Sequence, residues 1–181
     1  MFTHSFFKHH HDFYIQQDDV WLQMLLQLHI AADYKNERDF KLKAISELRN
    51  SNIYKLSKIN IDQVEDNLLN SQKLSLLAFW ALALLYNVNV TVVLGNLYFV
   101  VGNQPTYFID HTNTIKKIPS SNFSELYCLK NVAKPLNAMS YYNITDLENI
   151  VSRLRLSKGS KTYMYNGIQN YIQTALFEKY I

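Results

Sequence analysis

Two side chains in this chain have the types that a thiol hydrolase needs, the single cysteine, Cys128, and the histidine His111. The run from Thr106 to Asp110 predicts a strand, and His111 comes where that strand ends. An imidazole placed there is suited to act as the general base for a thiol nucleophile. Cys128, however, follows further strands and does not begin a helix, where a thiolate would be stabilised. The sequence therefore favours a buried structural cysteine, because free cysteine is among the most buried residue types.

The carboxylate next to His111 does not complete a catalytic pair. Asp110 is its neighbour in the sequence, and adjacent residues on a strand point to opposite faces. Asp110 therefore cannot orient His111 directly, as the acidic member of a catalytic triad would. We expect His111 to make an ordinary hydrogen bond at the end of its strand.

No metal or nucleotide cofactor is expected. Consecutive histidines on an extended segment point to alternate sides, so one metal site would need a turn and further ligands. This applies to the N-terminal histidines His4, His9, His10 and His11. The chain also lacks a Gly-rich phosphate loop, a Walker motif and a dinucleotide fingerprint.

The elements that position these residues begin with helices. Apolar spacing predicts a first helix from Asp19, with Asp18 or Asp19 accepting its first backbone N–H groups. A second helix covers Glu37 to Arg49, and the alternating signs of its charges indicate a solvated face. The segment from Leu74 to Leu85 is apolar nearly all round, which is typical of a central buried helix.

A small sheet follows the apolar helix. Asn87 is a natural helix stop, because asparagine tolerates the left-handed conformation. The segments Val88–Leu94 and Leu97–Val101 predict two paired strands, and Gly95-Asn96 is expected to supply the positive φ angles of a two-residue turn. One or two further short strands are expected between Ile115 and Leu129.

The C-terminal part predicts two helices. Thr145 and Glu148 have capping-box spacing, which places a helix start at Asp146. The segment Lys158–Lys161 breaks this helix, and a final helix follows. We therefore expect an α+β fold, with N-terminal helices, a small mostly antiparallel sheet and a C-terminal helical hairpin. The predicted domains are residues 1–134, with an aromatic N-terminal arm, and residues 135–181.

Charge and composition leave the partner open. A formal charge of +3 and an isoelectric point near 8.8 are mildly basic, well short of a concentrated nucleic-acid-binding charge. One cysteine excludes an internal disulfide and fits a reducing compartment. The longest apolar run, Leu74–Val101, is interrupted by polar residues, and its continuous apolar part is too short to span a bilayer. No signal peptide is recognisable, so we expect a location in the cytoplasm.

Four segments of the sequence carry a family resemblance. They are the first helix Asp18–Leu28, the helix and strand Leu77–Val93, the strand Tyr107–His111 and the tail KPLNAMSYYNITDLENI. Together they resemble an uncharacterised protein family of large nucleocytoplasmic DNA viruses, especially mimivirus-like ones. The resemblance implies a papain-like or deubiquitinase-like core of the OTU type and a location in the host cytoplasm, a viral factory or a virion.

In many of those relatives the first helix carries a cysteine, which pairs with the strand histidine. Here Asp19 or Gln23 holds that position, and neither side chain can form the attacking thiolate. The resemblance therefore implies a degenerate site made of Asp19, Gln23 and His111, and we expect no enzymatic activity.

The tail also resembles a SAP-type helix-extended-helix module, which many proteins use to contact DNA. In that resemblance, phosphate contacts would come from Arg153, Arg155, Lys158 and Lys161. Basic residues expected late in the second helix are absent, which implies modest, salt-sensitive binding.

The sequence supports three functional hypotheses. We favour a catalytically inactive, hydrolase-like viral protein that binds other viral proteins or forms part of the virion. In that hypothesis the aromatic residues Phe6, Phe7, Phe13 and Tyr14 either dock on another subunit or pack on their own domain. The first alternative is a DNA-associated factor that acts through the C-terminal hairpin, and the second is an active thiol hydrolase that uses Cys128 and His111.

Overall fold

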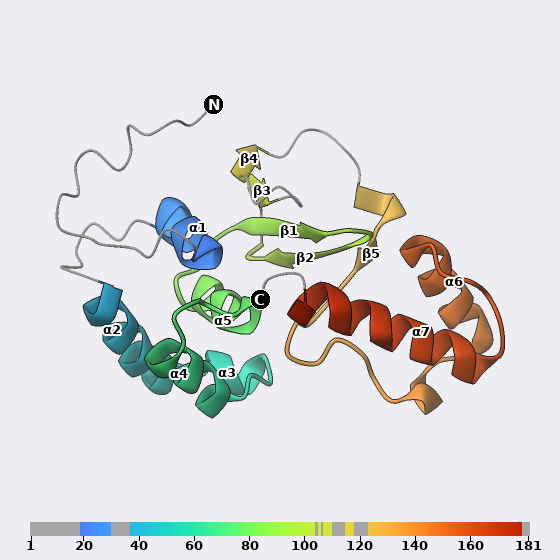
Figure 1. The fold of residues 1–181 in the computed structure, drawn as a ribbon, viewed down its shortest axis with the longest axis horizontal. Coiled ribbons are helices and arrows are strands. Elements are labelled where there is room, and N and C mark those ends of the chain that lie inside the picture. The colour runs from blue at the N-terminus through green and yellow to red at the C-terminus, as the bar shows by residue number, and fades with distance from the viewer. Residues whose placement is uncertain are drawn as a thin grey trace. The chain divides into compact units, whose positions relative to one another are not determined.

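The chain divides into two compact units, residues 1–86 and 87–181. The computed structural model describes residues 19–29, 37–103, 105, 107–109, 115–117 and 123–178 (Figure 1). The domain boundary predicted between residues 134 and 135 falls inside the second unit.

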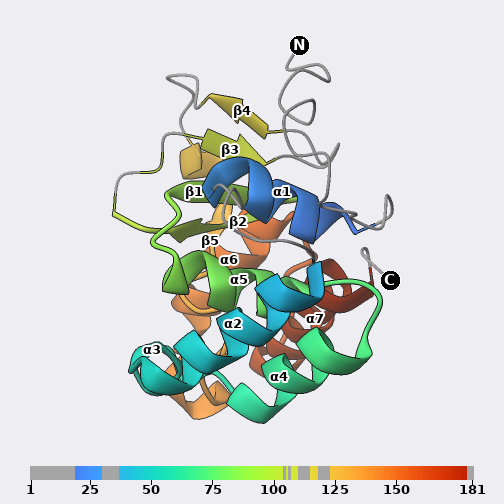
Figure 2. The same ribbon diagram turned by 90° about the vertical axis from the view of Figure 1, so that its left-hand side faces the viewer.

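The described part of the first unit is helical. Its elements are α1 (Val20–His29), α2 (Glu37–Asn50), α3 (Ile53–Leu56), α4 (Ile61–Asn70) and α5 (Leu76–Leu85). The helices α1, α2, α3 and α4 all contact α5, and Figure 2 shows α5 among them. A helix surrounded in this way must be apolar on every face, which explains why all side chains from Leu76 to Ala83 are buried. The predicted central helix is confirmed.

Both ends of α5 have local causes in the sequence. The Ser75 side chain accepts a hydrogen bond from the Ala78 N–H at 3.1 Å, so it caps the first turn. At the other end Asn87 has a φ of +52°, the left-handed conformation predicted for it. Aromatic rings from other helices reinforce the packing, and Trp21 lies 4.8 Å from Phe79 between ring centroids.

One five-stranded sheet lies in the described part of the second unit. Its strands are β1 (Val90–Leu94), β2 (Leu97–Val101), β3 (Tyr107–Ile109), β4 (Ile115–Lys117) and β5 (Tyr127–Cys128), in the order β4-β3-β1-β2-β5. The antiparallel ladders β1–β2 and β3–β4 hold five and three residue pairs. The parallel ladders β1–β3 and β2–β5 hold three and two. The sheet is therefore mixed, with antiparallel pairs in the majority.

The turn between β1 and β2 differs from the prediction in one respect. Gly95 has a φ of +64°, but Asn96 does not have a positive φ. A two-residue turn with only its first central residue in this region is of type II′, which needs glycine there. The strands pair as predicted, with Leu94 opposite Leu97.

Two longer helices complete the second unit, α6 (Ile144–Leu154) and α7 (Lys161–Gln173). A π-helical turn, η4 (Thr174–Glu178), follows α7, and short 3₁₀ segments, η2 (Phe123–Glu125) and η3 (Met139–Tyr141), precede α6. The helices pack through buried apolar side chains, which are Leu147, Ile150, Val151 and Leu154 on α6 and Met164, Ile168 and Ile172 on α7. The predicted α+β class with C-terminal helices is confirmed.

The start of α6 corrects the predicted capping box. Asn143, not Thr145, is the N-cap, and its side chain accepts from the Asp146 N–H at 2.8 Å. The Asp146 carboxylate in turn accepts from the Asn143 N–H at 2.9 Å. The helix therefore begins two residues earlier than predicted, because asparagine and aspartate satisfy the same orphan donors as the Thr/Glu pair would.

Candidate functional site

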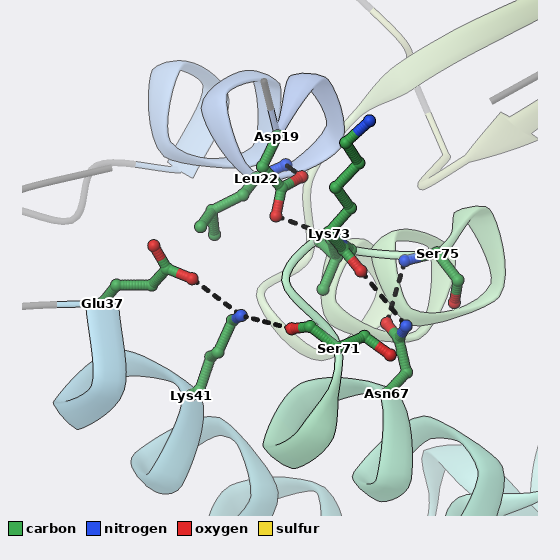
Figure 3. Close-up of polar contacts among 9 residues, drawn as sticks. Asp19, Leu22, Glu37, Lys41, Asn67, Ser71, Lys73 and Ser75 are labelled. Atoms are coloured by element: carbon green, nitrogen blue, oxygen red, sulfur yellow. Dashed lines mark hydrogen bonds and ion pairs between the residues drawn. The ribbon is translucent and has the colours of Figure 1, made fainter. Parts of the chain in front are cut away.

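Asp19, one of the degenerate-site residues, lies at the start of α1 and is 1% exposed. Its Oδ1 accepts a hydrogen bond from the Leu22 N–H at 3.0 Å, the N-cap role predicted from the sequence. Its Oδ2 accepts from the Leu74 N–H at 2.8 Å, which ties α1 to the segment just before α5. Figure 3 shows Asp19 and Leu22 at the start of α1. The carboxylate is therefore used on both oxygens to hold two elements together.

Other polar side chains of the first unit form further hydrogen bonds and an ion pair near Asp19 (Figure 3). Lys41 on α2 lies 2.7 Å from the Glu37 carboxylate and donates to the Ser71 carbonyl at 3.4 Å. Asn67 on α4 donates to the Lys73 carbonyl at 3.2 Å, and its Oδ1 accepts from the Ser75 N–H at 2.9 Å. We call the contacts of Asp19, Lys41 and Asn67 the Asp19 network. They hold the segment between α4 and α5 in place.

The electrostatics of Asp19 fit a structural carboxylate. Burial raises its pKa above the ordinary value, while the hydrogen bonds from Leu22 and Leu74 and the charge of Lys41 oppose that rise. Gln23 lies one turn further along α1 and is half-buried. Both residues therefore belong to a packed helix start within the first unit.

The position of His111 is not described, and neither is that of Asp110. The same holds for the N-terminal histidines and the aromatic residues from Phe6 to Tyr14. The predicted pairing of His111 with the first helix or with Cys128 therefore stays a prediction.

Cys128 lies on β5, in parallel register with Tyr98 on β2. Its side chain is half-buried, whereas the sequence predicted a buried cysteine. The difference arises because β5 is the outer strand of the sheet. Burial and a hydrogen bond with Cys128 raise the pKa of Tyr98. Burial also raises the pKa of Tyr127, which precedes Cys128 on β5, to about 12. The thiol is thus on a strand and not at a helix N-terminus, as the sequence indicated.

The α6–α7 pair, residues 144–173, has an extended connection. Residues 155–160 run back along α6, since Lys158 Nζ of this loop lies 3.9 Å from Glu148 Oε2 in the first half of α6. Tyr142, just before α6, lies 6.3 Å from Tyr165 near the start of α7, between ring centroids. The two helices therefore begin at the same end of the pair, as Figure 1 shows.

The predicted phosphate-binding residues lie on this connection and at the helix ends that flank it, with Arg153 in the last turn of α6. Arg153, Arg155 and Lys158 are exposed, and Lys161 is half-buried at the first position of α7. Arg153 also donates to the Leu126 carbonyl at 3.3 Å. Arg155 ends α6 with a φ of +57°, a left-handed conformation that is costly for a residue other than glycine.

The stretch of sequence that contains these four residues has no acidic residue. From Asn149 to Phe177 the sequence contains no Asp or Glu. Residues 87–181 contain nine Lys and Arg against five Asp and Glu, whereas residues 1–86 contain nine against ten. The excess positive charge of the chain therefore belongs to the second unit.

The α6–α7 pair is attached to the sheet of its own unit. The Asn96 side chain in the β1–β2 turn donates to the Leu154 carbonyl at 3.1 Å. The Asn96 N–H donates to the Tyr171 hydroxyl at 2.9 Å. A side chain on Gly95 would lie 2.8 Å from that hydroxyl, so the turn glycine also permits this close approach. The helices that flank the basic loop are thus bonded to the β1–β2 turn.

Metal-ligating side chains do not gather in the part of the chain that the structure describes. These residues contain no group of three or more His, Cys, Asp or Glu side chains placed to hold a metal ion. Within the same residues, none of the helices is long and apolar enough to cross a membrane.

Comparison with known proteins yields no match, whether against family models, curated proteins or solved structures.

Sequence reasoning missed three features of these regions. The hydrogen bond from the Leu74 N–H to Asp19 joins residues far apart in the sequence, so no local sequence pattern predicts it. The left-handed Arg155 was also missed, since glycine is the usual signal for that conformation. The acid-free stretch around the four basic residues is readable in the sequence and could have been found by a charge count.

Proposed function

We propose that this protein is a non-catalytic, nucleic-acid-binding protein of a large DNA virus, and that the α6–α7 pair and its loop form the binding surface. The observation that carries the proposal is the set of basic side chains on and beside an extended loop without acidic residues, between helices that are hydrogen-bonded to the sheet of the same unit. Such side chains attract phosphates, which dominate the affinity of proteins for nucleic acids.

The arrangement suits phosphates better than it suits an internal structural role. Lys158 keeps 65% of its side chain exposed, and its distance of 3.9 Å to Glu148 is at the outer limit of an ion pair. Such exposed pairs contribute little to stability and give way readily to another anion. Arg155, moreover, occupies a strained backbone position, and its side chain is exposed.

The non-catalytic part of the proposal is supported by Asp19. A thiol hydrolase of the resembled type needs a nucleophile at the start of the first helix. The residue at that position uses both carboxylate oxygens to bind backbone N–H groups. A hydrolase-like core without its nucleophile remains available for binding, since function depends on the site and not on the fold.

The proposal is tested by fluorescence anisotropy with labelled DNA at several salt concentrations. Lys158→Glu with Lys161→Glu should weaken binding at least about 10-fold at low salt. It should also reduce the slope of log affinity against log salt by about 1 for each phosphate that the variant no longer binds. The matched control is Lys55→Glu with Lys58→Glu, which makes the same change of charge at the same spacing in the first unit. The control should bind like the unchanged protein.

Two results would contradict the proposal. One is the absence of any binding to DNA or RNA at low salt. The other is an equal loss of affinity in both double variants, since a general charge effect would then account for the binding.

A second candidate, a virion-associated structural role with other viral proteins as partners, is favoured by a separate observation. Large apolar side chains are exposed around the start of α6, namely Met139 at 37%, Tyr141 at 71% and Ile144 at 56%. Exposed apolar side chains in one segment are typical of protein interfaces. Tyr141→Glu with Ile144→Glu should then prevent incorporation into virus particles, measured by immunoblotting of purified particles. Unchanged incorporation would exclude this surface as the contact.

A further inference from the structure

Tyr163 is an exposed aromatic side chain inside the basic region. It occupies the third position of α7, and 59% of its surface is exposed. Its backbone N–H donates to the side chain of Ser160, the N-cap residue, at 3.2 Å. The helix start therefore holds the backbone of Tyr163 in place.

The ring of Tyr163 rests on Gly159. A Cβ atom added to Gly159 would lie 2.7 Å from Cδ1 and 3.3 Å from Cγ of the tyrosine ring. Real Cβ atoms essentially never approach so closely, so only glycine allows the ring to occupy this position. One part of the ring is thus supported by the loop backbone, and the rest is open to solvent.

Positive charges stand on both sides of this ring in the sequence. Lys158 precedes Gly159, and Lys161 lies between Ser160 and Tyr163. An aromatic ring next to cations is the combination with which proteins bind single strands, because bases stack on the ring while phosphates contact the cations.

We propose that Tyr163 is a stacking platform for an unpaired base, so that the preferred ligand of the α6–α7 pair is single-stranded nucleic acid. This inference rests on the function proposed above and adds the class of ligand. In a duplex both faces of each base are already covered by its neighbours, so an exposed tyrosine ring gains nothing from them. In a single strand the base can turn out and stack on Tyr163.

Single-stranded DNA and single-stranded RNA share the chemistry that this platform would recognise. The test therefore uses four labelled probes of about 12 nucleotides, a length in the range of small single-strand sites. They are an oligothymidylate, an oligouridylate, a DNA duplex and an abasic strand with the same number of phosphates. Binding of the full chain to each probe is measured at the same salt concentration.

The variants separate stacking from charge and from packing. Tyr163→Leu removes the aromatic face and keeps an apolar side chain, and it should weaken single-strand binding about 5- to 100-fold. Tyr163→Phe keeps the face and should bind like the unchanged protein. Tyr141→Leu is the matched control, because Tyr141 is also an exposed tyrosine of the second unit but has no cation beside it in the sequence. It should leave the affinity unchanged.

The expected result is tighter binding to one or both single strands than to the duplex and the abasic strand, with a loss only in Tyr163→Leu. Equal binding to the duplex, or an unchanged affinity in Tyr163→Leu, would overturn the stacking platform and leave the phosphate-binding function standing. An equal loss in Tyr141→Leu would also overturn the assignment to Tyr163. Failure to bind any of the four probes would instead reject the proposed function itself.

Discussion

The Asp19 network and the basic loop of the α6–α7 pair use charged side chains in opposite ways. Asp19 is buried, and backbone N–H groups occupy both of its oxygens. Arg155 and Lys158 are exposed, and the distance from Lys158 to its acidic neighbour is 3.9 Å. A buried charge must find its partners within the protein, whereas an exposed one keeps water that a ligand can replace. Changes in the first region should therefore alter stability, and changes in the second should alter binding.

The largest expected effect is a loss of stability on Asp19→Ala. The change removes the N-cap of α1 and leaves the buried Leu74 N–H without its acceptor, so we expect a decrease in the free energy of unfolding of about 2 to 4 kcal/mol. Chemical denaturation followed by tryptophan fluorescence measures it, since Trp21 and Trp80 both lie in the first unit. Asp66→Ala, at an exposed carboxylate that accepts from the Asn70 side chain, should change stability by less than about 0.5 kcal/mol.

Arg155→Gly should have a smaller effect on stability and in the opposite direction. Glycine adopts the left-handed conformation without strain, so the free energy of unfolding should rise by about 0.5 to 1 kcal/mol. The same change removes one cation of the loop, so affinity for nucleic acid should fall about 3- to 10-fold at low salt. On one preparation, chemical denaturation measures the free energy of unfolding and fluorescence anisotropy measures the affinity for nucleic acid. A variant that is more stable and binds as before would show that Arg155 takes no part in binding.

The ion pair between α2 and α4 offers a test by pH. Glu65 Oε1 and Oε2 lie 2.6 Å from Nε and Nη2 of Arg49, and the hydrogen bonds from Arg49 lower the pKa of Glu65 below its ordinary 4.5. The stability contributed by Glu65 is therefore present above pH 4.5 and is lost as the pH falls through the lowered pKa. Glu65→Gln should cost at most about 1 kcal/mol at pH 7 and progressively less in acid. Glu47→Gln, in an exposed and longer pair with Lys43, should cost less at every pH.

Asp19 should show the opposite pH dependence, because the pKa of Asp19 is shifted mainly by burial and that of Glu65 mainly by hydrogen bonds from Arg49. Burial raises its pKa above 3.8, so the folded state binds a proton there more tightly than the unfolded chain. The stability gained from that proton is complete below pH 3.8 and is lost as the pH rises through the raised pKa. The difference in unfolding free energy between the unchanged protein and Asp19→Ala should therefore shrink as the pH rises from about 4 to 7. A difference that grows over this range would mean that the two N–H bonds outweigh burial.

Local patterns in the sequence predicted most elements of the fold. The apolar run from Leu76 to Leu85, the left-handed Asn87 and the strands beside Gly95 were all recognisable, because each depends on residues within a few positions. The start of α6 was placed two residues late, since two overlapping pairs had capping-box character and only the backbone shows which pair is used.

The sequence by itself determined the α+β class, the basic residues Arg153, Arg155, Lys158 and Lys161, and the absence of a cysteine from the first helix. Only the tertiary structure decided that Asp19 is tied to Leu74 and that the α6–α7 pair is bonded to the β1–β2 turn. The first group follows from residue types and short periods, which local backbone geometry converts directly into helices and strands. The second group depends on contacts between residues that meet only when the chain has packed, so no local pattern specifies them.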